Sequence, residues 1–230
     1  MNGPLIIGAG PAGTAAAITL LRGGAKPMVL EAQRETGDAI CGGFLSWQTL
    51  KQLDALGLDG AALGGAPVTI MRLFAGKHEA EVALPAPAMG LSRQRLDRLM
   101  QAKAVALGVG LEMGVSVRAV EGDAVMMADG ATIRPESLFL ATGKHDLRGA
   151  GRERKGAPTL GLRVRIPSHP ALRTLIGPAI ELHLFGGGYA GLSAALTLAR
   201  LGHDVTVLEA ERIGWGASSR NGGMVSGGLK

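Results

Sequence analysis

The sequence has few cysteines and few aromatic residues. Cys41 is the single cysteine among 230 residues, which excludes an internal disulfide and a cysteine-cluster metal site. The five histidines show no metal-binding spacing, so no metal ligand is predicted. Aromatic residues make up only 3% of the chain, so Ala, Leu, Val, Ile and Met must form its core. The 47% of hydrophobic residues against 19% of charged ones is typical of a globular protein.

The chain also lacks a long uninterrupted hydrophobic run and a concentrated basic stripe. Its apolar start at residues 5–21 contains three glycines and a proline and is too short to cross a bilayer, so no stable membrane insertion is expected. The net charge of +5 is scattered along the chain, which argues against a nucleic-acid partner. We therefore expect a cytoplasmic protein whose partner is a small-molecule substrate.

Glycine, by contrast, is abundant, and its 37 residues gather in short motifs. The first motif lies in PLIIGAGPAGTAAAITLLRGGAKPMVLEA, residues 4–32. The pattern predicts a strand at 5–7, a glycine turn, a helix to about Arg22 and a second strand at 28–30. A strand, a crossover helix and a further strand open a parallel sheet, so the sequence predicts an α/β fold.

The turn carries the pattern GxGxxG of a dinucleotide-binding fingerprint. Gly8 permits the tight turn, Gly10 lets the backbone approach a pyrophosphate, and Gly13 permits close packing of the helix on the strand. Glu31 ends the second strand, where its carboxylate can bind ribose hydroxyls and would repel the 2′-phosphate of NADP. This context makes the fingerprint specific and predicts a Rossmann-like FAD/NAD(P)-binding fold with a parallel sheet. The predicted cofactor-binding residues of this unit are Gly8, Gly10, Pro11, Ala12, Gly13, Glu31 and Ala32.

Periodicity and turn residues predict the remaining elements. The helices are expected at 45–56, closed by Gly57, and at 93–107, with Ser92 as N-cap and Gly108 as the end. The strands are expected as an antiparallel pair over 67–84 that turns at 76–77, near 115–120, in a hairpin through 129–130, and at 137–140, 160–166 and 180–185. Residues 167–178 are expected to form a connector.

Three stretches, in this order, carry a family resemblance. They are G-x-x-x-C-G-G at 37–43, GLSRQRLDRLMQAKAVALGV at 90–109 and LFLATGKHDLRG at 138–149. Over residues 4–185 the chain resembles FAD-dependent oxidoreductases of the geranylgeranyl reductase and aromatic hydroxylase type; the paired-tryptophan motif of flavin halogenases is missing. The resemblance implies FAD as cofactor, NAD(P)H as electron donor and a hydrophobic or aromatic substrate that is reduced or oxygenated at the flavin.

The resemblance also implies site residues beyond the fingerprint. Arg93 would reach the FAD, the strand at 115–117 would lie beside the adenine, and the turn at 141–143 would pack near the dinucleotide. Two glycines follow Cys41, which favours a close approach of backbone to the flavin over a covalent flavin link or a redox thiol. The residues concerned are Cys41, Gly42, Gly43, Arg93, Val117, Ala141, Thr142 and Gly143. No catalytic acid or base is assigned.

A second fingerprint stands near the other end of the sequence. Aligned without gaps, residues 8–34 and 186–212 are identical at 15 of 27 positions, and both copies place an acidic residue 23 positions after the first glycine. Residues 186–230 resemble the N-terminal FAD-binding segment of glycine oxidase and D-amino-acid oxidase-like (DAO) enzymes. By that resemblance, the cofactor-binding residues here are Gly186, Gly188, Gly191 and Glu209.

We therefore expect an FAD-binding domain at 1–158 with an antiparallel excursion at about 66–86. The start of a substrate domain at 159–185 and a second, truncated βαβ unit at 186–230 would follow. Because the Gly-Asp FAD-binding segment of the first family is missing, three interpretations stay open. They are an NAD(P)H-linked monooxygenase or reductase, a catalytically incomplete dinucleotide-binding fusion or fragment, and an amine or amino-acid oxidase. A lone βαβ unit cannot bury both faces of its strands, so it would join the first sheet, pack as an appendage or mediate self-association.

Overall fold

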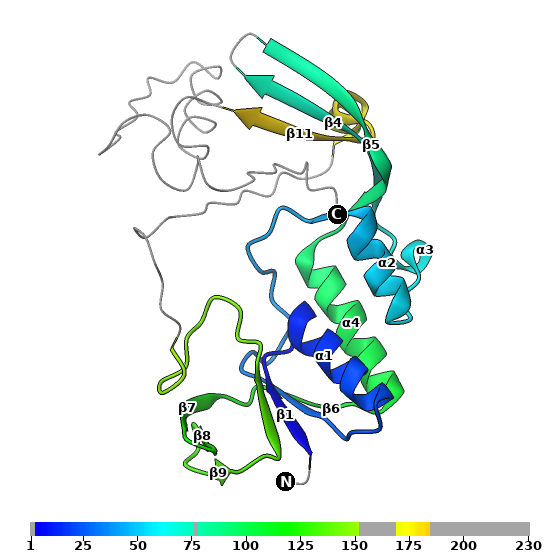
Figure 1. Cartoon of the computed structure of the whole chain (residues 1–230). Coiled ribbons are helices and arrows are strands. Elements are labelled where there is room, and N and C mark those ends of the chain that lie inside the picture. The colour runs from blue at the N-terminus through cyan, green and yellow to red at the C-terminus, as the bar shows by residue number, and fades with distance from the viewer. Residues whose placement is uncertain (1–2, 76–77, 152–168, 185–230) are drawn as a thin grey trace, which may run out of the picture. The chain divides into compact units, whose positions relative to one another are not determined.

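The computed structural model describes residues 3–75, 78–151 and 169–184 (Figure 1), which form two compact units. Unit 1 comprises the described residues of Met1–Ala39, Lys51–Gly64 and Arg93–Arg154. Unit 2 comprises those of Ile40–Leu50, Gly65–Ser92 and Lys155–Lys230. The expected domain boundaries at 158 and 185 lie outside the described residues and stay a prediction.

Unit 1 is built on a four-stranded parallel sheet in the order β10-β1-β2-β6. Its strands are β1 (Pro4–Ile7), β2 (Met28–Glu31), β6 (Gly110–Met113) and β10 (Ser137–Leu140). The chain builds β2 and β6 on one side of β1 and then adds β10 on the other, so the strand order reverses beside β1. In open parallel sheets, ligands bind at such a point, outside the carboxyl ends of the strands. The expected α/β, Rossmann-like fold is confirmed.

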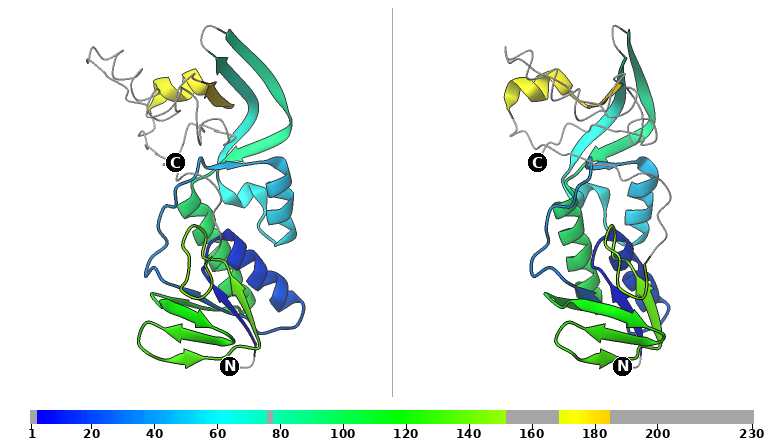
Figure 2. Two further views of the ribbon diagram at one scale, coloured as in Figure 1. Left: turned by 60° about the vertical axis from the view of Figure 1, so that its left-hand side comes forward. Right: turned by 90° about the vertical axis from the view of Figure 1, so that its left-hand side faces the viewer.

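Two helices cover one face of this sheet, and a small antiparallel sheet covers the other (Figures 1 and 2). The covering elements are α1 (Pro11–Arg22), α4 (Arg93–Leu107), β7 (Val117–Glu121), β8 (Ala124–Met127) and β9 (Thr132–Ile133). Successive side chains of a strand point to opposite faces. In β1, Ile6 therefore packs under the helices, while Leu5 and Ile7 pack under the antiparallel sheet. These three fully or nearly fully buried residues join both cores of the unit.

The helix ends follow their sequence signals. Helix α1 begins with Pro11, whose fixed φ suits the first helical position and which has no N–H to leave without an acceptor. Helix α4 spans the predicted residues and ends before Gly108, whose φ of 101° is easily adopted only by glycine. The helix predicted at 45–56 is the shorter α2 (Trp47–Ala55), because Leu45 belongs to a strand.

Unit 2 contains a mixed sheet in the order β11-β4-β5-β3. Its strands are β3 (Phe44–Leu45), β4 (Ala66–Ala75), β5 (His78–Gly90) and β11 (Ala179–Leu184). The pair β4 and β5 is antiparallel, as predicted, but extends beyond 67–84, while β11 lies parallel to β4. Val68, Ala88 and Ile180 form the buried core of this sheet.

Arg72 joins several elements of unit 2. Its Nε donates to Glu81 Oε2 on β5 at 2.8 Å, and its Nη1 lies 3.4 Å from Glu181 Oε1 on β11. The same Nη1 donates to the carbonyl oxygens of Leu175 and Ile176, at 3.1 and 3.2 Å. The hydrogen bond to Glu81, reinforced by Glu181, raises the pKa of the Arg72 guanidinium above its usual value.

Four described elements were missed by the sequence prediction: β3, α3 (Gly60–Leu63), β6 and α5 (Pro170–Ile176). Strand β6 was not expected, and residues 167–178, expected as a connector, contain α5. The signals of α5 were present: Pro170 stands at its start and Gly177 at its end, and His169 Nδ1 accepts a hydrogen bond from the Ala171 N–H. The remaining described helix is the single turn α3. The strand predicted at 160–166 and the turn at 76–77 lie outside the described residues. Among the described helices, none is long and apolar enough to span a membrane.

Candidate dinucleotide-binding site

In the turn that follows β1, the backbone conformation and the packing of the protein itself require glycine at two of the three fingerprint positions. Gly8 has a φ of 106°, and a Cβ there would meet the carbonyl oxygen of Ala141. A Cβ at Gly13 would overlap the carbonyl oxygen of Gly8. The first glycine therefore permits the turn, and the third permits the close approach of α1 to β1.

Gly10 differs from the other two glycines. Its φ of −72° and ψ of −178° are values that any residue adopts. An added Cβ would find Arg93 Nη2 as its nearest neighbour at 3.7 Å, an ordinary van der Waals contact. Neither the backbone conformation nor the packing of the described protein requires a glycine here.

The N-terminus of α1 meets the conditions for an anion site. Gly10 is the N-cap and offers no side chain to cap the helix, and the first turn holds no acidic residue. The N–H groups of Ala12 and Gly13 belong to this turn, whose donors have no acceptor within the helix. Together with the positive end of the helix dipole, they favour a bound phosphate.

Glu31 stands where β2 ends, next to the glycine turn. Its Oε2 accepts a hydrogen bond from the Ala9 N–H at 2.8 Å, and its Oε1 accepts one from the Gln33 N–H at 3.0 Å. A carboxylate has about four lone-pair sites, so these two bonds leave it able to accept from ribose hydroxyls. Its predicted contact with the ribose, like that of the neighbouring Ala32, stays a prediction.

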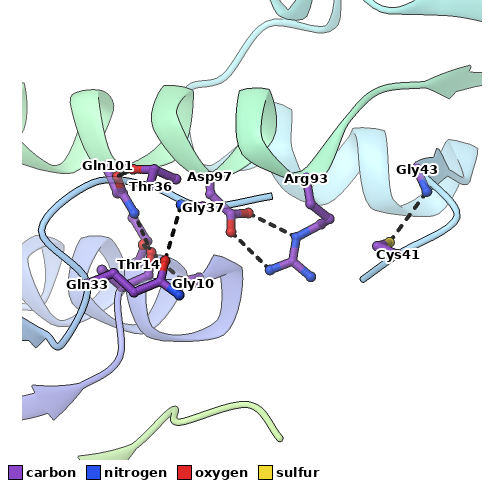
Figure 3. A network of polar contacts seen from close by, with 11 residues as sticks. Gly10, Thr14, Gln33, Thr36, Gly37, Cys41, Gly43, Arg93, Asp97 and Gln101 are labelled. Carbon is purple, nitrogen blue, oxygen red and sulfur yellow. Dashed lines mark hydrogen bonds and ion pairs between the residues drawn. The ribbon is translucent and has the colours of Figure 1, made fainter. Parts of the chain in front are cut away.

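Side chains from α1 and α4 hold the carbonyl groups of the turn. The Thr14 hydroxyl lies 3.1 Å from the Ala9 oxygen and 3.0 Å from the Gly10 oxygen. Gln101 Nε2 donates to the same Ala9 oxygen at 2.9 Å, and its Oε1 accepts from the Thr36 hydroxyl at 2.7 Å (Figure 3). The turn is thus fixed by residues that lie far apart in the sequence, and the sequence analysis identified neither Thr14 nor Gln101.

Arg93 and Asp97 form a two-point ion pair on the same side of α4. Nε and Nη2 of Arg93 lie 2.9 and 3.0 Å from Oδ1 and Oδ2 of Asp97 (Figure 3). Asp97 is buried, with 6% of its surface exposed, and Arg93 Nη2 lies 3.7 Å from where a Cβ added to Gly10 would stand. The structure therefore brings the predicted Arg93 to the glycine turn and adds Asp97, which the sequence analysis missed although it lies one helical turn further on.

The turn after β10 also lies at this site. The Ala141 N–H donates to the Ile7 oxygen at 2.8 Å, so residues 141–143 follow the strand that neighbours β1. The Thr142 hydroxyl donates to the His145 oxygen at 2.5 Å, and Gly143 has a φ of 64°. Ala141, Thr142 and Gly143 are thus placed at the carboxyl end of the sheet, and their predicted packing beside the dinucleotide stays a prediction.

The structure does not test the contacts predicted for the other residues. Val117 is half-buried on β7 and packs against the core under the antiparallel sheet, so its predicted contact with adenine remains a prediction. Cys41, Gly42 and Gly43 belong to unit 2, where the half-buried Cys41 accepts a hydrogen bond at Sγ from the Gly43 N–H at 3.4 Å. The residues of the second fingerprint lie outside the described residues: Gly186, Gly188, Gly191 and Glu209.

A parallel sheet with a glycine turn at its strand-order reversal is typical of dinucleotide-binding domains. Residues 4–146 match the family model described as an FAD binding domain. Because this match covers more than half of the chain, the chain belongs to that FAD-binding family. Residues 185–230 match a second family model, described as FAD dependent oxidoreductase. Both matches confirm the two resemblances predicted from the motifs.

Two curated relatives match short stretches of the chain. One stretch of 45 residues is 70% identical to the gamma-glutamylputrescine oxidoreductase of Escherichia coli (strain K12), covering 20% of this chain and 11% of that protein. A stretch of 66 residues is 47% identical to the probable oxidoreductase OrdL of Rhizobium meliloti (strain 1021), covering 28% and 15%. The chain thus spans a small part of the length of either relative.

Solved structures share the fold of the larger part of the chain. A flavoprotein/dehydrogenase from Cytophaga hutchinsonii matches with a TM-score of 0.53 and 25% identity, over 62% of this chain and 40% of that one. The flavin-dependent brominase Bmp2 matches with a TM-score of 0.53 and 24% identity, over 63% and 39%. At that identity the brominase shows the common fold alone.

Proposed function

We propose that unit 1 binds the ADP half of FAD at the carboxyl end of β1, and that the protein is an FAD-dependent oxidoreductase. The main support for this proposal is the glycine at position 10. The protein itself requires glycine at Gly8 and Gly13 but not at Gly10, where a Cβ would be tolerated. A ligand that approaches the backbone closely explains the missing side chain, and a pyrophosphate is the ligand that such a turn accepts.

The residues around the turn suit the two chemically distinct parts of the ADP half. The N–H groups of Ala12 and Gly13 would donate to the pyrophosphate, and the Arg93 guanidinium would compensate its negative charge. Glu31 would accept hydrogen bonds from the ribose hydroxyls. Bound FAD supplies the redox chemistry, while the protein binds and orients it.

The substrate and the electron donor follow from the family resemblance. In this proposal NAD(P)H reduces the flavin, and a hydrophobic or aromatic small molecule is oxygenated or reduced. The motifs at 37–43, 90–109 and 138–149 support this activity. The scattered charge supports the proposal that the protein has no nucleic-acid partner. A cytoplasmic location is part of the proposal as well.

A second candidate function is that of an amine or amino-acid oxidase. It rests on the match of residues 185–230 to the FAD dependent oxidoreductase family and on the 70% identity of a short stretch to an oxidoreductase. In that case, Gly186, Gly188, Gly191 and Glu209 would bind the cofactor instead of the first fingerprint.

Matched variants of the two fingerprints separate these candidates. Gly10→Glu and Gly188→Glu place the same charged side chain at equivalent positions, where it would repel a pyrophosphate. We expect the visible absorption band of bound flavin to disappear in Gly10→Glu and to persist in Gly188→Glu. The opposite pattern would assign the cofactor to the second fingerprint. A colourless wild-type protein that cannot be reconstituted with FAD would contradict both candidates.

Turnover is tested on the same preparation. Flavin-dependent oxidation of NADH or NADPH, followed by the loss of the absorbance of the reduced nicotinamide, would support the first candidate. Oxidation of an amine or amino acid with oxygen as acceptor would support the second. Bound FAD without either activity would favour a dinucleotide-binding module.

A further inference from the structure

The ion pair between Arg93 and Asp97 stands out among the described salt bridges because its carboxylate is buried. The Asp97 side chain is 9% exposed, whereas the acidic partner in each other described pair is 24% exposed or more. A buried carboxylate needs a compensating cation, and the two hydrogen bonds at 2.9 and 3.0 Å supply it in the two-point geometry of a guanidinium.

Helix stability does not explain this pair. Arg93 is the first residue of α4, where the positive end of the helix dipole disfavours a cation. An acid four residues after a base is also the less favourable order for an ion pair along a helix. Replacing such a buried pair by apolar residues is often neutral or stabilising in proteins. The pair therefore has a use other than holding α4 together.

The position of Arg93 indicates that use. Its Nη2 lies within van der Waals distance of a Cβ added at Gly10. Gly10 is the one fingerprint glycine that neither the backbone conformation nor the packing of the protein requires. The same Nη2 is held by Asp97 Oδ2, so Asp97 sets where this nitrogen lies. We propose that Asp97 is a positioning residue, which holds the Arg93 guanidinium at the glycine turn so that it meets the diphosphate of a bound nucleotide. This inference rests on the proposed binding of FAD in unit 1.

Asp97→Asn tests the inference because it keeps the shape of the side chain and removes its charge. The affinities of the full-length protein for ADP and for adenosine are measured by competition against FAD. Asp123→Asn is the matched control, since it removes the same charge from a 77% exposed partner of Arg134. We expect ADP to bind about tenfold more weakly to Asp97→Asn, as is typical for a misplaced charged hydrogen bond. Adenosine, which has no diphosphate, should bind as before, and Asp123→Asn should bind both ligands like the wild type.

Two results would overturn the inference. One is an Asp97→Asn protein with unchanged ADP affinity, and the other is an equal loss for ADP and adenosine, which would indicate general damage to the site. In an Arg93→Ala background, Asp97→Asn should have no further effect on ADP binding, because Asp97 acts through the arginine. A further loss of ADP affinity in that background would contradict this.

The test remains decisive if Asp97→Asn does not fold. Arg93→Lys then replaces the planar guanidinium by a flexible point charge that cannot form the two-point pair. A severalfold loss of ADP affinity supports the inference, and wild-type affinity overturns it. A wild-type protein that binds neither FAD nor ADP would instead contradict the proposed function, and the inference with it. Wild-type binding that Gly10→Glu abolishes and Asp97→Asn leaves unchanged would refute the inference alone.

Discussion

Arg72 in unit 2 and Arg93 in unit 1 both bind carboxylates, yet their surroundings differ. Arg72 donates to two glutamates on neighbouring strands and to two carbonyl oxygens at the end of α5, where a cation is favoured. Arg93 opens α4, where a cation is disfavoured, and pairs with a buried aspartate. The number of hydrogen bonds therefore does not separate Arg72, which joins elements of its own unit, from Arg93, for which we propose a role in ligand binding. What distinguishes the two arginines is the free-energy cost of placing a positive charge at each position, which is low at the end of α5 and high at the start of α4.

The largest effect is expected for Arg93→Ala. It leaves the Asp97 carboxylate buried without its cation, which should lower the free energy of unfolding by about 3 kcal/mol. ADP affinity should fall at least about tenfold, because a charged contact to the diphosphate is lost. Urea denaturation and competition against FAD measure the two effects. Arg134→Ala breaks an exposed pair and should change stability by no more than about 0.5 kcal/mol.

The double variant Arg93→Met/Asp97→Leu separates stability from binding. Since both charges leave the interior together, the free energy of unfolding should return to within about 1 kcal/mol of the wild-type value, or exceed it. ADP affinity should remain as weak as in Arg93→Ala. A double variant that recovers ADP binding would show that Arg93 is a structural residue like Arg72.

Two glycines of the fingerprint also differ in whether the fold requires them or the proposed ligand does. Gly10→Ala should leave the free energy of unfolding unchanged or raise it by about 0.4–1 kcal/mol, because alanine adopts its backbone conformation and narrows the unfolded ensemble. FAD should nevertheless bind more weakly, since the new methyl group faces the ligand. Gly13→Ala should lower stability in urea denaturation, because its Cβ would overlap the Gly8 carbonyl. Equal stability losses in both variants would contradict the proposed role of Gly10.

The smallest effect is expected for Arg72→Met. The Glu81 and Glu181 side chains are 52% and 24% exposed, so water can solvate them when the arginine is removed. We expect the Tm to fall by only a few degrees and the affinities for FAD and ADP to stay unchanged. A loss of ADP affinity comparable to that of Arg93→Ala would remove the distinction between the two arginines.

The part of the fold that follows from local signals was predictable. The strand, turn, helix and strand of residues 4–31 agree with the prediction to within a residue, because a glycine turn and apolar runs mark them. Strand β6 was missed because it has only four residues, begins with Gly110 and is followed by Gly114. Its strand conformation comes from parallel pairing with β2. That pairing joins segments about 80 residues apart, which no local pattern reveals.

The residues of the candidate site also fall into those that sequence motifs predicted and those that only the structure revealed. The fingerprint glycines and Arg93 were found from motifs. Thr14 and Gln101 were missed because their role is to bind backbone oxygens, and Gln101 reaches Ala9 across 92 positions of sequence. Asp97 was the exception, since its spacing of four from Arg93 on a predicted helix was legible and only its burial required the structure.

The anchoring of Ala9 has a kinetic consequence. Its N–H is held by Glu31 and its carbonyl by Thr14 and Gln101, so hydrogen bonds within unit 1 fix the shape of the turn. A preorganised loop loses little conformational entropy when it binds, and association needs no prior rearrangement. The observed rate of FAD association should therefore rise linearly with FAD concentration, and substitutions at the turn should change mainly the lifetime of the complex.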